Sequence, residues 1–116
     1  MNITRRQKRV GSLIKEEVSR LFLEEIQDSS SCLITVTRVE MSTDLKTAYI
    51  YFSVFGSEKK ETILELLEAR KGHLRKSIAS KVKLKYNPLL IFSLDPLTEY
   101  QERIDSALEK IKKNGK

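Results

Sequence analysis

The sequence contains one cysteine and one histidine, and these shortages exclude several kinds of site. Cys32 cannot form an internal disulfide, and no second cysteine is present to hold a zinc ion with it. We expect Cys32 to be a small buried hydrophobic residue near the start of a strand. His73 alone cannot supply a Ser/His/Asp arrangement with a spare ligand, nor a histidine-rich metal site.

Phosphate-binding glycine loops and long apolar runs are also missing. Neither GxxxxGK[ST] nor GxGxxG occurs, and no apolar run approaches the roughly 18 residues that span a bilayer. The N-terminus is polar and basic, without the apolar core of a signal peptide. We therefore expect a soluble, cytoplasmic protein that is not an enzyme, needs no cofactor and does not bind membranes.

The size and composition favour one folded domain. A chain of 116 residues with 40% hydrophobic residues can build a single core, with no room for a second. We expect one domain over residues 1–116, in which residues 112–116 form a frayed tail.

The charge is concentrated in blocks. The formal net charge is +6, yet the chain between Leu21 and Ala69 is acidic. Lysine and arginine gather at the N-terminus, between Arg70 and Lys85, where no acid occurs, and in the C-terminal tail. Blocks of one sign favour a polyanionic partner over mere solubility.

Hydrophobic spacing predicts seven elements. The first is a helix opened by a Thr4/Gln7 capping box, with Arg5 and Arg9 opposite its apolar stripe. Two strands follow at 33–41 and 47–55, and the short connection 42–46 makes them a hairpin. The apolar stripe of the first helix comprises Val10, Leu13, Ile14, Val18, Leu21 and Phe22.

The second half of the chain predicts helix, helix, strand and helix. Ser57 is placed to cap a helix, and Gly72 is predicted to kink or interrupt it, after which helical spacing resumes in a new register. The apolar run 89–94 is expected to be a strand in mid-sheet or covered on both faces. After Asp95-Pro96, Thr98 and Gln101 offer a second capping box to a last helix. The order predicts an α+β fold with helices packed on a three-stranded sheet.

The segment from Arg70 to Lys85 is the strongest functional signal. Its seven cations form a concentrated footprint for RNA phosphates, although a core helix with a solvated basic face would look similar. We expect its charged side chains to be replaceable at little cost to stability, because its apolar face is committed to the core. Tyr86 is suited either to base stacking or to packing, and His73 to a surface position or to a nucleotide contact.

Four stretches together resemble the ribosome-binding factor A family of bacterial small-subunit assembly factors. Their order and spacing make the resemblance specific and extend it over most of the chain. The stretches are Arg6-Gln7-Lys8-Arg9-Val10 followed by Ile14, Glu17 and Leu21; residues 35–48; Gly72-His73-Leu74-Arg75 leading to Leu84, Pro88, Leu90, Phe92 and Asp95; and residues 99–104.

The resemblance implies a type II KH-like fold and a binding function without catalysis. It implies contact with the immature 30S subunit through 16S rRNA, help with late rRNA processing, growth in the cold, and release by assembly GTPases. The family has an Ala-x-Gly helix kink, for which Gly72 supplies the glycine while Arg70 stands two residues before it. We expect a monomer whose rRNA-binding residues are Arg5, Arg6, Arg9, Arg70, Lys71, Arg75, Lys76, Lys81, Lys83 and Lys85.

Two other interpretations remain open. In a protein-interaction module, the acidic helix between Glu58 and Glu68 or the C-terminal stripe would hold another protein, and nucleic-acid contact would be incidental. A DNA-binding domain is a third interpretation. The salt dependence of binding separates the first from an RNA-binding role, and competition with duplex DNA separates the second.

Overall fold

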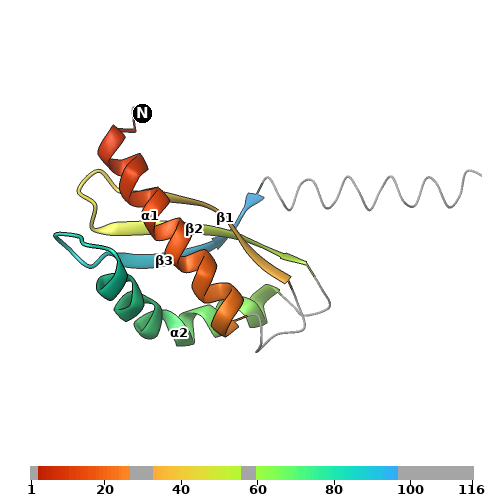
Figure 1. The fold of residues 1–116 in the computed structure, drawn as a ribbon. Coiled ribbons are helices and arrows are strands. Elements are labelled where there is room, and N and C mark those ends of the chain that lie inside the picture. The colour runs from red at the N-terminus through yellow and green to blue at the C-terminus, as the bar shows by residue number, and fades with distance from the viewer. Residues whose placement is uncertain (1–2, 27–32, 56–59, 97–116) are drawn as a thin grey trace, which may run out of the picture.

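Two helices lie on one face of a three-stranded sheet in the computed structural model, which describes residues 3–26, 33–55 and 60–96 (Figure 1). The elements in chain order are α1 (Arg5–Leu21), η1 (Phe22–Ile26, a π-helical turn), β1 (Leu33–Met41), β2 (Thr47–Phe55), α2 (Lys60–Lys81) and β3 (Leu89–Leu94). This arrangement confirms the α+β prediction and agrees with a type II KH-like fold.

The start of α1 is fixed by the predicted capping box. Thr4 Oγ1 accepts from the Gln7 backbone N–H at 3.1 Å, and Gln7 Oε1 accepts from the Thr4 N–H at 2.9 Å. Gln7 is buried, and its Nε2 also donates to the Met41 carbonyl at 3.0 Å. The same side chain thus caps the helix and ties its first turn to the end of β1.

The first two strands form the predicted antiparallel hairpin. Their register pairs Leu33 with Phe55 and Met41 with Ala48, and it shifts between Val36 and Arg38. The shift leaves Thr37 as an extra residue, a β-bulge. Ala48, Ile50, Phe52 and Val54 of β2 are buried as their alternation predicts.

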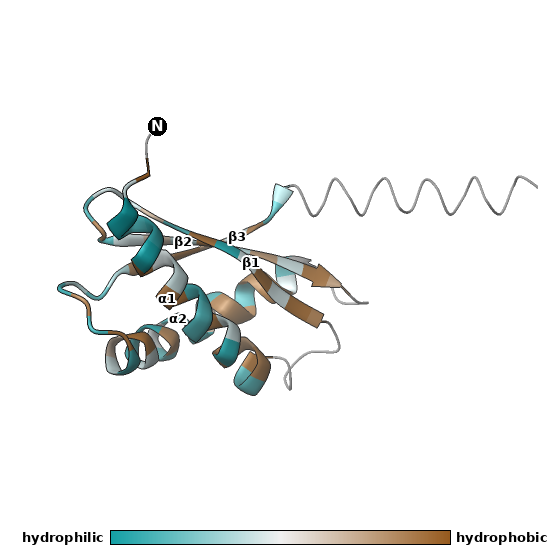
Figure 2. Ribbon diagram, turned by 45° about the horizontal axis from the view of Figure 1, so that its top comes forward, coloured by the Kyte–Doolittle hydropathy of each residue, from teal (hydrophilic) through white to brown (hydrophobic). Residues whose placement is uncertain are grey.

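The prediction that residues 89–94 form a strand is confirmed, but its place in mid-sheet was wrong. The strand order is β1-β2-β3, so among the described strands β3 lies at the edge and pairs in parallel with β2. Leu90 and Phe92 face the core, whereas Leu89 and Ile91 are exposed. The apolar run therefore has two causes. One face of β3 packs in the core, and its other face is apolar although no described helix covers it (Figure 2).

The predicted interruption at Gly72 was wrong, because α2 runs through it as one helix; a kink within that helix stays a prediction. Gly72 does not adopt a left-handed φ, and nothing lies within 4 Å of where its Cβ would be. The predicted new register fails too, since the buried residues before and after it fall on one stripe at about 100° per residue. Those buried residues are Ile63, Leu67, Leu74 and Ile78.

The core lies between the two helices and the inner face of the sheet. It includes Ile14 and Val18 of α1, Phe22 and Ile26 of η1, and Phe52 of β2, all almost completely buried. In the described ranges, no helix is long and apolar enough to cross a membrane. Cys32, the Ser57 cap, the Thr98 capping box, the last helix and the frayed tail lie outside the described residues.

Candidate nucleic-acid interface

Three segments far apart in the sequence meet at one end of the domain. They are the N-terminal turns of α1, the β1–β2 connection at 42–46 and the α2–β3 connection at 82–88 (Figure 1). Leu89 N donates to Lys46 O at 2.9 Å and joins the two connections, while Gln7 Nε2 donates to Met41 O at 3.0 Å and joins α1 to the hairpin. Two of the predicted basic blocks are therefore held beside each other.

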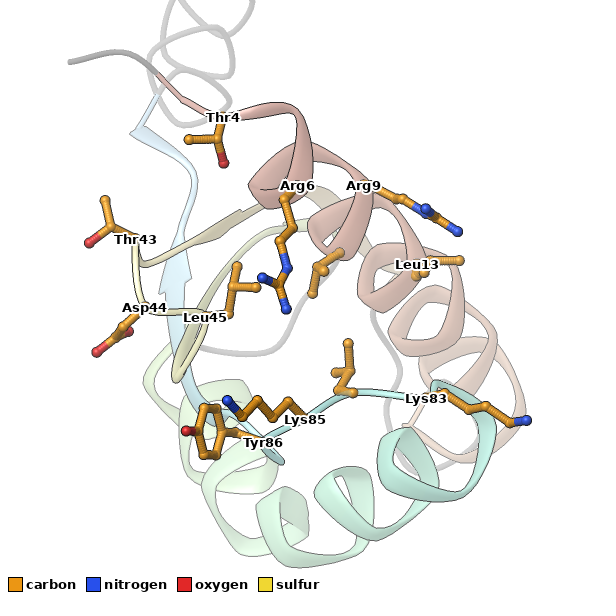
Figure 3. Close-up of a pocket in the computed structure, with 12 residues that line it drawn as sticks. Thr4, Arg6, Arg9, Leu13, Thr43, Asp44, Leu45, Lys83, Lys85 and Tyr86 are labelled. Atoms are coloured by element: carbon orange, nitrogen blue, oxygen red, sulfur yellow. The ribbon is translucent and has the colours of Figure 1, made fainter.

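A cavity of about 480 Å³ lies between these segments. Arg6 extends into it from α1, while Lys85 lies beside Tyr86 on the opposite wall; Arg9 and Lys83 point outward at the rim (Figure 3). Its lining residues are Thr4, Arg6, Arg9, Val10, Leu13, Thr43, Asp44, Leu45, Lys83, Leu84, Lys85 and Tyr86. Four cations and one carboxylate thus surround a partly apolar hollow, and we call it the basic cavity.

The hairpin connection is held rigid by its own polar groups. Asp44 Oδ1 accepts from the Ser42 hydroxyl at 2.6 Å and from the Lys46 N–H at 3.0 Å, and both bonds lower the pKa of Asp44. Leu45 has a left-handed φ of 60°, which is uncommon for a residue with a branched side chain. The single acid of the basic cavity is therefore engaged in shaping this turn.

Tyr86 is a half-exposed aromatic ring between two ammonium groups. Its exposed fraction is 44%, and Lys46 Nζ and Lys85 Nζ lie 5.0 and 5.5 Å from its ring centroid. Both distances are within the range of cation–π attraction. The half-exposed ring and the two ammonium groups over it together form an aromatic and positively charged surface, a combination that suits a nucleotide base and its phosphate.

The cations at the N-terminal end of α1 do not stabilise the helix. Arg5, Arg6, Lys8 and Arg9 are exposed in its first two turns, and its first turn contains no acid. The positive end of the helix dipole disfavours cations there by roughly 0.3–1 kcal/mol each at low salt. Folding gives no reason for this placement, whereas binding of an anion does.

The basic residues of α2 fall into two groups. Lys76 and Lys81 are exposed, as a phosphate contact requires, and so are Lys83 and Lys85 beyond the helix. Arg70 and Lys71 are only half-exposed; Lys71 Nζ lies 2.8 Å from Glu68 Oε2 and 6.0 Å from the centroid of Phe92.

Arg75 corrects the expectation that every basic side chain here is replaceable at little cost. Its Nε donates to Pro88 O at 3.0 Å and its Nη2 donates to Asn87 O at 3.1 Å. Because two carbonyls of the α2–β3 connection depend on this guanidinium, Arg75 contributes to the structure whether or not it also meets RNA.

Sequence analysis missed several residues of this end. Lys46 stands beside Asp44 in an otherwise acidic stretch, so its charge gave no local signal. Leu13 was assigned to the core stripe, but it is 41% exposed and lines the basic cavity. The helical spacing of apolar residues could not reveal that the cavity opens beside Leu13.

His73 lies on the surface, as the first of its two interpretations predicts. Its side chain is 54% exposed, and its Nε2 lies 2.9 Å from Glu25 Oε1 of η1. Over the ranges 3–26, 33–55 and 60–96, no cluster of three histidine, cysteine or acidic side chains is suited to a metal ion.

Residues 6–108 match the family model described as Ribosome-binding factor A. The chain belongs to the ribosome-binding factor A family. Among curated members, it is 42% identical over 109 residues to ribosome-binding factor A of Halothermothrix orenii, covering 92% of this chain and 88% of that protein. It is 36% identical over 108 residues to that of Clostridium tetani, covering 91% and 89%.

Structures of this family also resemble this chain in fold. A crystal structure of ribosome-binding factor A from Thermus thermophilus has a TM-score of 0.67 at 22% identity, covering 76% of this chain and 94% of that one. A second Thermus thermophilus coordinate set, a homology model fitted into a cryo-EM map of a complex with the 30S subunit, has a TM-score of 0.54 at 26% identity. It covers 70% of this chain and 90% of that one.

Proposed function

We propose that this chain binds the immature 30S ribosomal subunit through 16S rRNA and assists late 16S rRNA processing. The observation that carries the proposal is the basic cavity, where cations from α1 and from the α2–β3 connection converge on one hollow. Membership of the ribosome-binding factor A family supports the choice of partner, and so does the family member that was fitted into a 30S complex.

The geometry suits single-stranded or looped RNA better than a regular duplex. A cavity walled by a half-exposed tyrosine and four cations can take an unstacked nucleotide, with its base on Tyr86 and its phosphate near Arg6 or Lys85. Arg9, Lys81 and Lys83, at the rim and beyond it, would contact neighbouring phosphates. Arg5, Arg70, Lys71, Arg75 and Lys76 remain predicted contacts at the edge of this surface.

The charge layout supports one docking face. Apart from Asp44, none of the described residues that line the basic cavity is acidic, and four glutamates lie away from it: Glu24 and Glu25 are on η1, and Glu61 and Glu65 are in the first turns of α2. A molecule with opposite charges at its two ends is steered so that its basic end meets the RNA first. We further propose that the chain acts in the cytoplasm as a monomer without catalysis, and that an assembly GTPase releases it.

Co-sedimentation with immature 30S subunits, 50S subunits and 70S ribosomes tests the proposal. We expect retention on immature 30S subunits, and a loss of affinity of roughly tenfold or more for the Lys83→Glu/Lys85→Glu variant, because two attractive charges become repulsive. Lys15→Glu is the control, since Lys15 is an exposed cation of α1 that does not line the basic cavity. Equal losses per reversed charge for the two variants would reduce the effect to net charge and refute the cavity assignment.

A second measurement addresses the protein-interaction alternative. Glu61→Lys/Glu65→Lys reverses two exposed acids of α2 and should leave 30S binding intact. If this variant abolishes binding while the lysine reversals do not, a protein contact on the acidic end replaces the rRNA contact. Processing is followed separately, by the 5′ and 3′ ends of 16S rRNA in cells that carry each variant.

A further inference from the structure

The sheet has an outer face that neither described helix covers (Figure 2). Large apolar side chains nevertheless point from it, with exposed fractions between 38% for Tyr49 and 73% for Phe55. The exposed set on this face comprises Leu33, Tyr49, Phe55, Leu89 and Ile91. The register pairs Leu33 with Phe55 near one end of this face, and Tyr49 with Ile91, close to Leu89, near the other end. Adjacent exposed apolar side chains of this kind mark a surface that is covered in the working molecule.

The end of β3 presents the side chain of Asp95 on this same face. Asp95 shares the alternation of Ile91 and continues the ladder, since its N–H donates to Phe52 O at 2.9 Å. Its buried carboxylate accepts from the Thr37 hydroxyl at 2.5 Å and lies 4.0 Å from Arg38 Nε. Arg38 itself lies over the outer-face ring of Tyr51, 4.0 Å from its centroid. These contacts anchor Asp95, two residues before Leu97, at the outer face.

The sequence after Pro96 has the length and pattern to cover that face. If this segment is helical, with about 100° per residue, its apolar residues fall within an arc of about 120° around the helix axis. These residues are Leu97, Tyr100, Ile104, Ala107, Leu108 and Ile111. A helix over residues 97–111 would be about 22 Å long, close to the roughly 20 Å of the β3 strand beneath it.

We propose that residues 97–111 form an amphipathic helix that docks its apolar stripe on the outer face, over Tyr49, Leu89 and Ile91. Covalent attachment favours this occupant, because a tethered segment competes at a millimolar effective concentration, which an external partner or a second copy rarely reaches. The inference does not depend on the rRNA contact, since the basic cavity is formed by other side chains.

Methyl NMR on the full chain tests the docking directly. We expect nuclear Overhauser contacts between the δ1 methyl of Ile91 and the methyls of Ile104 or Leu108. A sample that mixes labelled and unlabelled chains separates contacts within one chain from contacts between copies. Contacts seen only between copies would mean that a second copy is the occupant, and the proposal fails. The absence of any contact between this face and residues 97–111 would also overturn it.

Matched substitutions keep the test independent of overall folding. Ile104→Asp places a charge in the stripe, whereas Ser106→Asp places the same charge about 160° away around the helix. We expect Ile104→Asp to abolish the Ile91 contacts and to shift the ring resonances of Tyr49, and Ser106→Asp to preserve both. The methyl spectrum of Ile14 and Ile50, which are fully buried elsewhere, reports whether the core stays folded. Loss of the Ile91 contacts in both variants would contradict a specific stripe.

Discussion

The guanidinium of Arg75 donates to the backbone carbonyl of Pro88 at 3.0 Å, joining the last turns of α2 to the entrance of β3. A second donation, to Asn87 O at 3.1 Å, fixes the same connection. Arg75 is thus a structural residue, although it lies in a basic segment. Its neighbour Lys76 is exposed and serves for comparison.

We predict that Arg75→Ala lowers the free energy of unfolding by about 1–3 kcal/mol, since two carbonyls lose a charged donor. Lys76→Ala should change it by less than about 0.5 kcal/mol, as exposed substitutions usually do. Urea denaturation of both variants measures the difference. Equal stabilities would mean that water replaces the guanidinium without cost.

Two helical glycines should respond to alanine in opposite directions. Nothing lies within 4 Å of a Cβ at Gly72, so Gly72→Ala should stabilise the protein by about 1 kcal/mol through helix propensity. A Cβ at Gly11 would lie 3.0 Å from the backbone oxygen of Val39, so Gly11→Ala should destabilise it by pushing α1 from β1. Thermal unfolding of the pair is the measurement. A stability loss for Gly72→Ala would indicate that the bend requirements of α2 outweigh propensity.

Stability in acid should depend on Asp44. The Ser42 hydroxyl, and then the Lys46 N–H, hold the pKa of Asp44 below its ordinary value. A pKa lowered by folding adds stability above the unfolded value of about 3.9, and this contribution is lost as the pH falls through the folded pKa. Asp44→Asn should therefore be less stable than the natural chain at pH 7, with the difference shrinking below about pH 4.

Ser42→Ala is the control for that pH effect, because it removes the first donor and leaves the carboxylate. In the Ser42→Ala background, the pH-dependent part of the Asp44→Asn difference should shrink. Urea denaturation at pH 7 and pH 3 measures all four proteins. A difference that does not change between these pH values would exclude a role for the Asp44 charge in stability.

Binding to 16S rRNA fragments should weaken linearly in a plot of log affinity against log salt. If Arg6 neutralises one phosphate, Arg6→Ala should reduce the steepness of that plot by roughly 1, whereas Lys15→Ala should leave it unchanged. Filter binding at several salt concentrations provides both slopes. Parallel lines for the natural chain and Arg6→Ala would place Arg6 outside the phosphate contacts.

The order and type of α1, β1, β2, α2 and β3 could be predicted because each had a local signal, whereas the π-helical turn η1 had none and the last helix lies outside the described residues. The Thr4/Gln7 capping box fixed a helix start, and the alternation around Ile50 and Phe52 identified a half-buried strand. The interruption at Gly72 was misread because a glycine in a helical pattern has the same sequence signature whether the helix ends there or continues. That decision depends on whether the stripe through Leu67 and Leu74 stays in register against the core.

The charged residues of the candidate site could be predicted from the sequence, but their arrangement in space could not. Local blocks identified Arg6 and Lys85, which the structure brings to one cavity. Their partnership with Lys46 and Tyr86 depends on the hairpin lying beside the α2–β3 connection, a long-range contact that no linear pattern encodes. The structural use of Arg75 was hidden for the same reason, since a guanidinium that clamps carbonyls has the same sequence signature as one that meets phosphate.

The basic cavity is assembled from segments that are about 30 to 80 positions apart in the chain, such as Arg6, Asp44 and Lys85. No fragment of the unfolded chain can present that arrangement, so an RNA that fits the cavity binds the native state and not the denatured ensemble. By mass action, RNA at 100 times its dissociation constant would then add about 2.7 kcal/mol to the stability of the domain. For a domain of this size, such a gain means that a marginally folded chain would complete its folding on the RNA to which it binds.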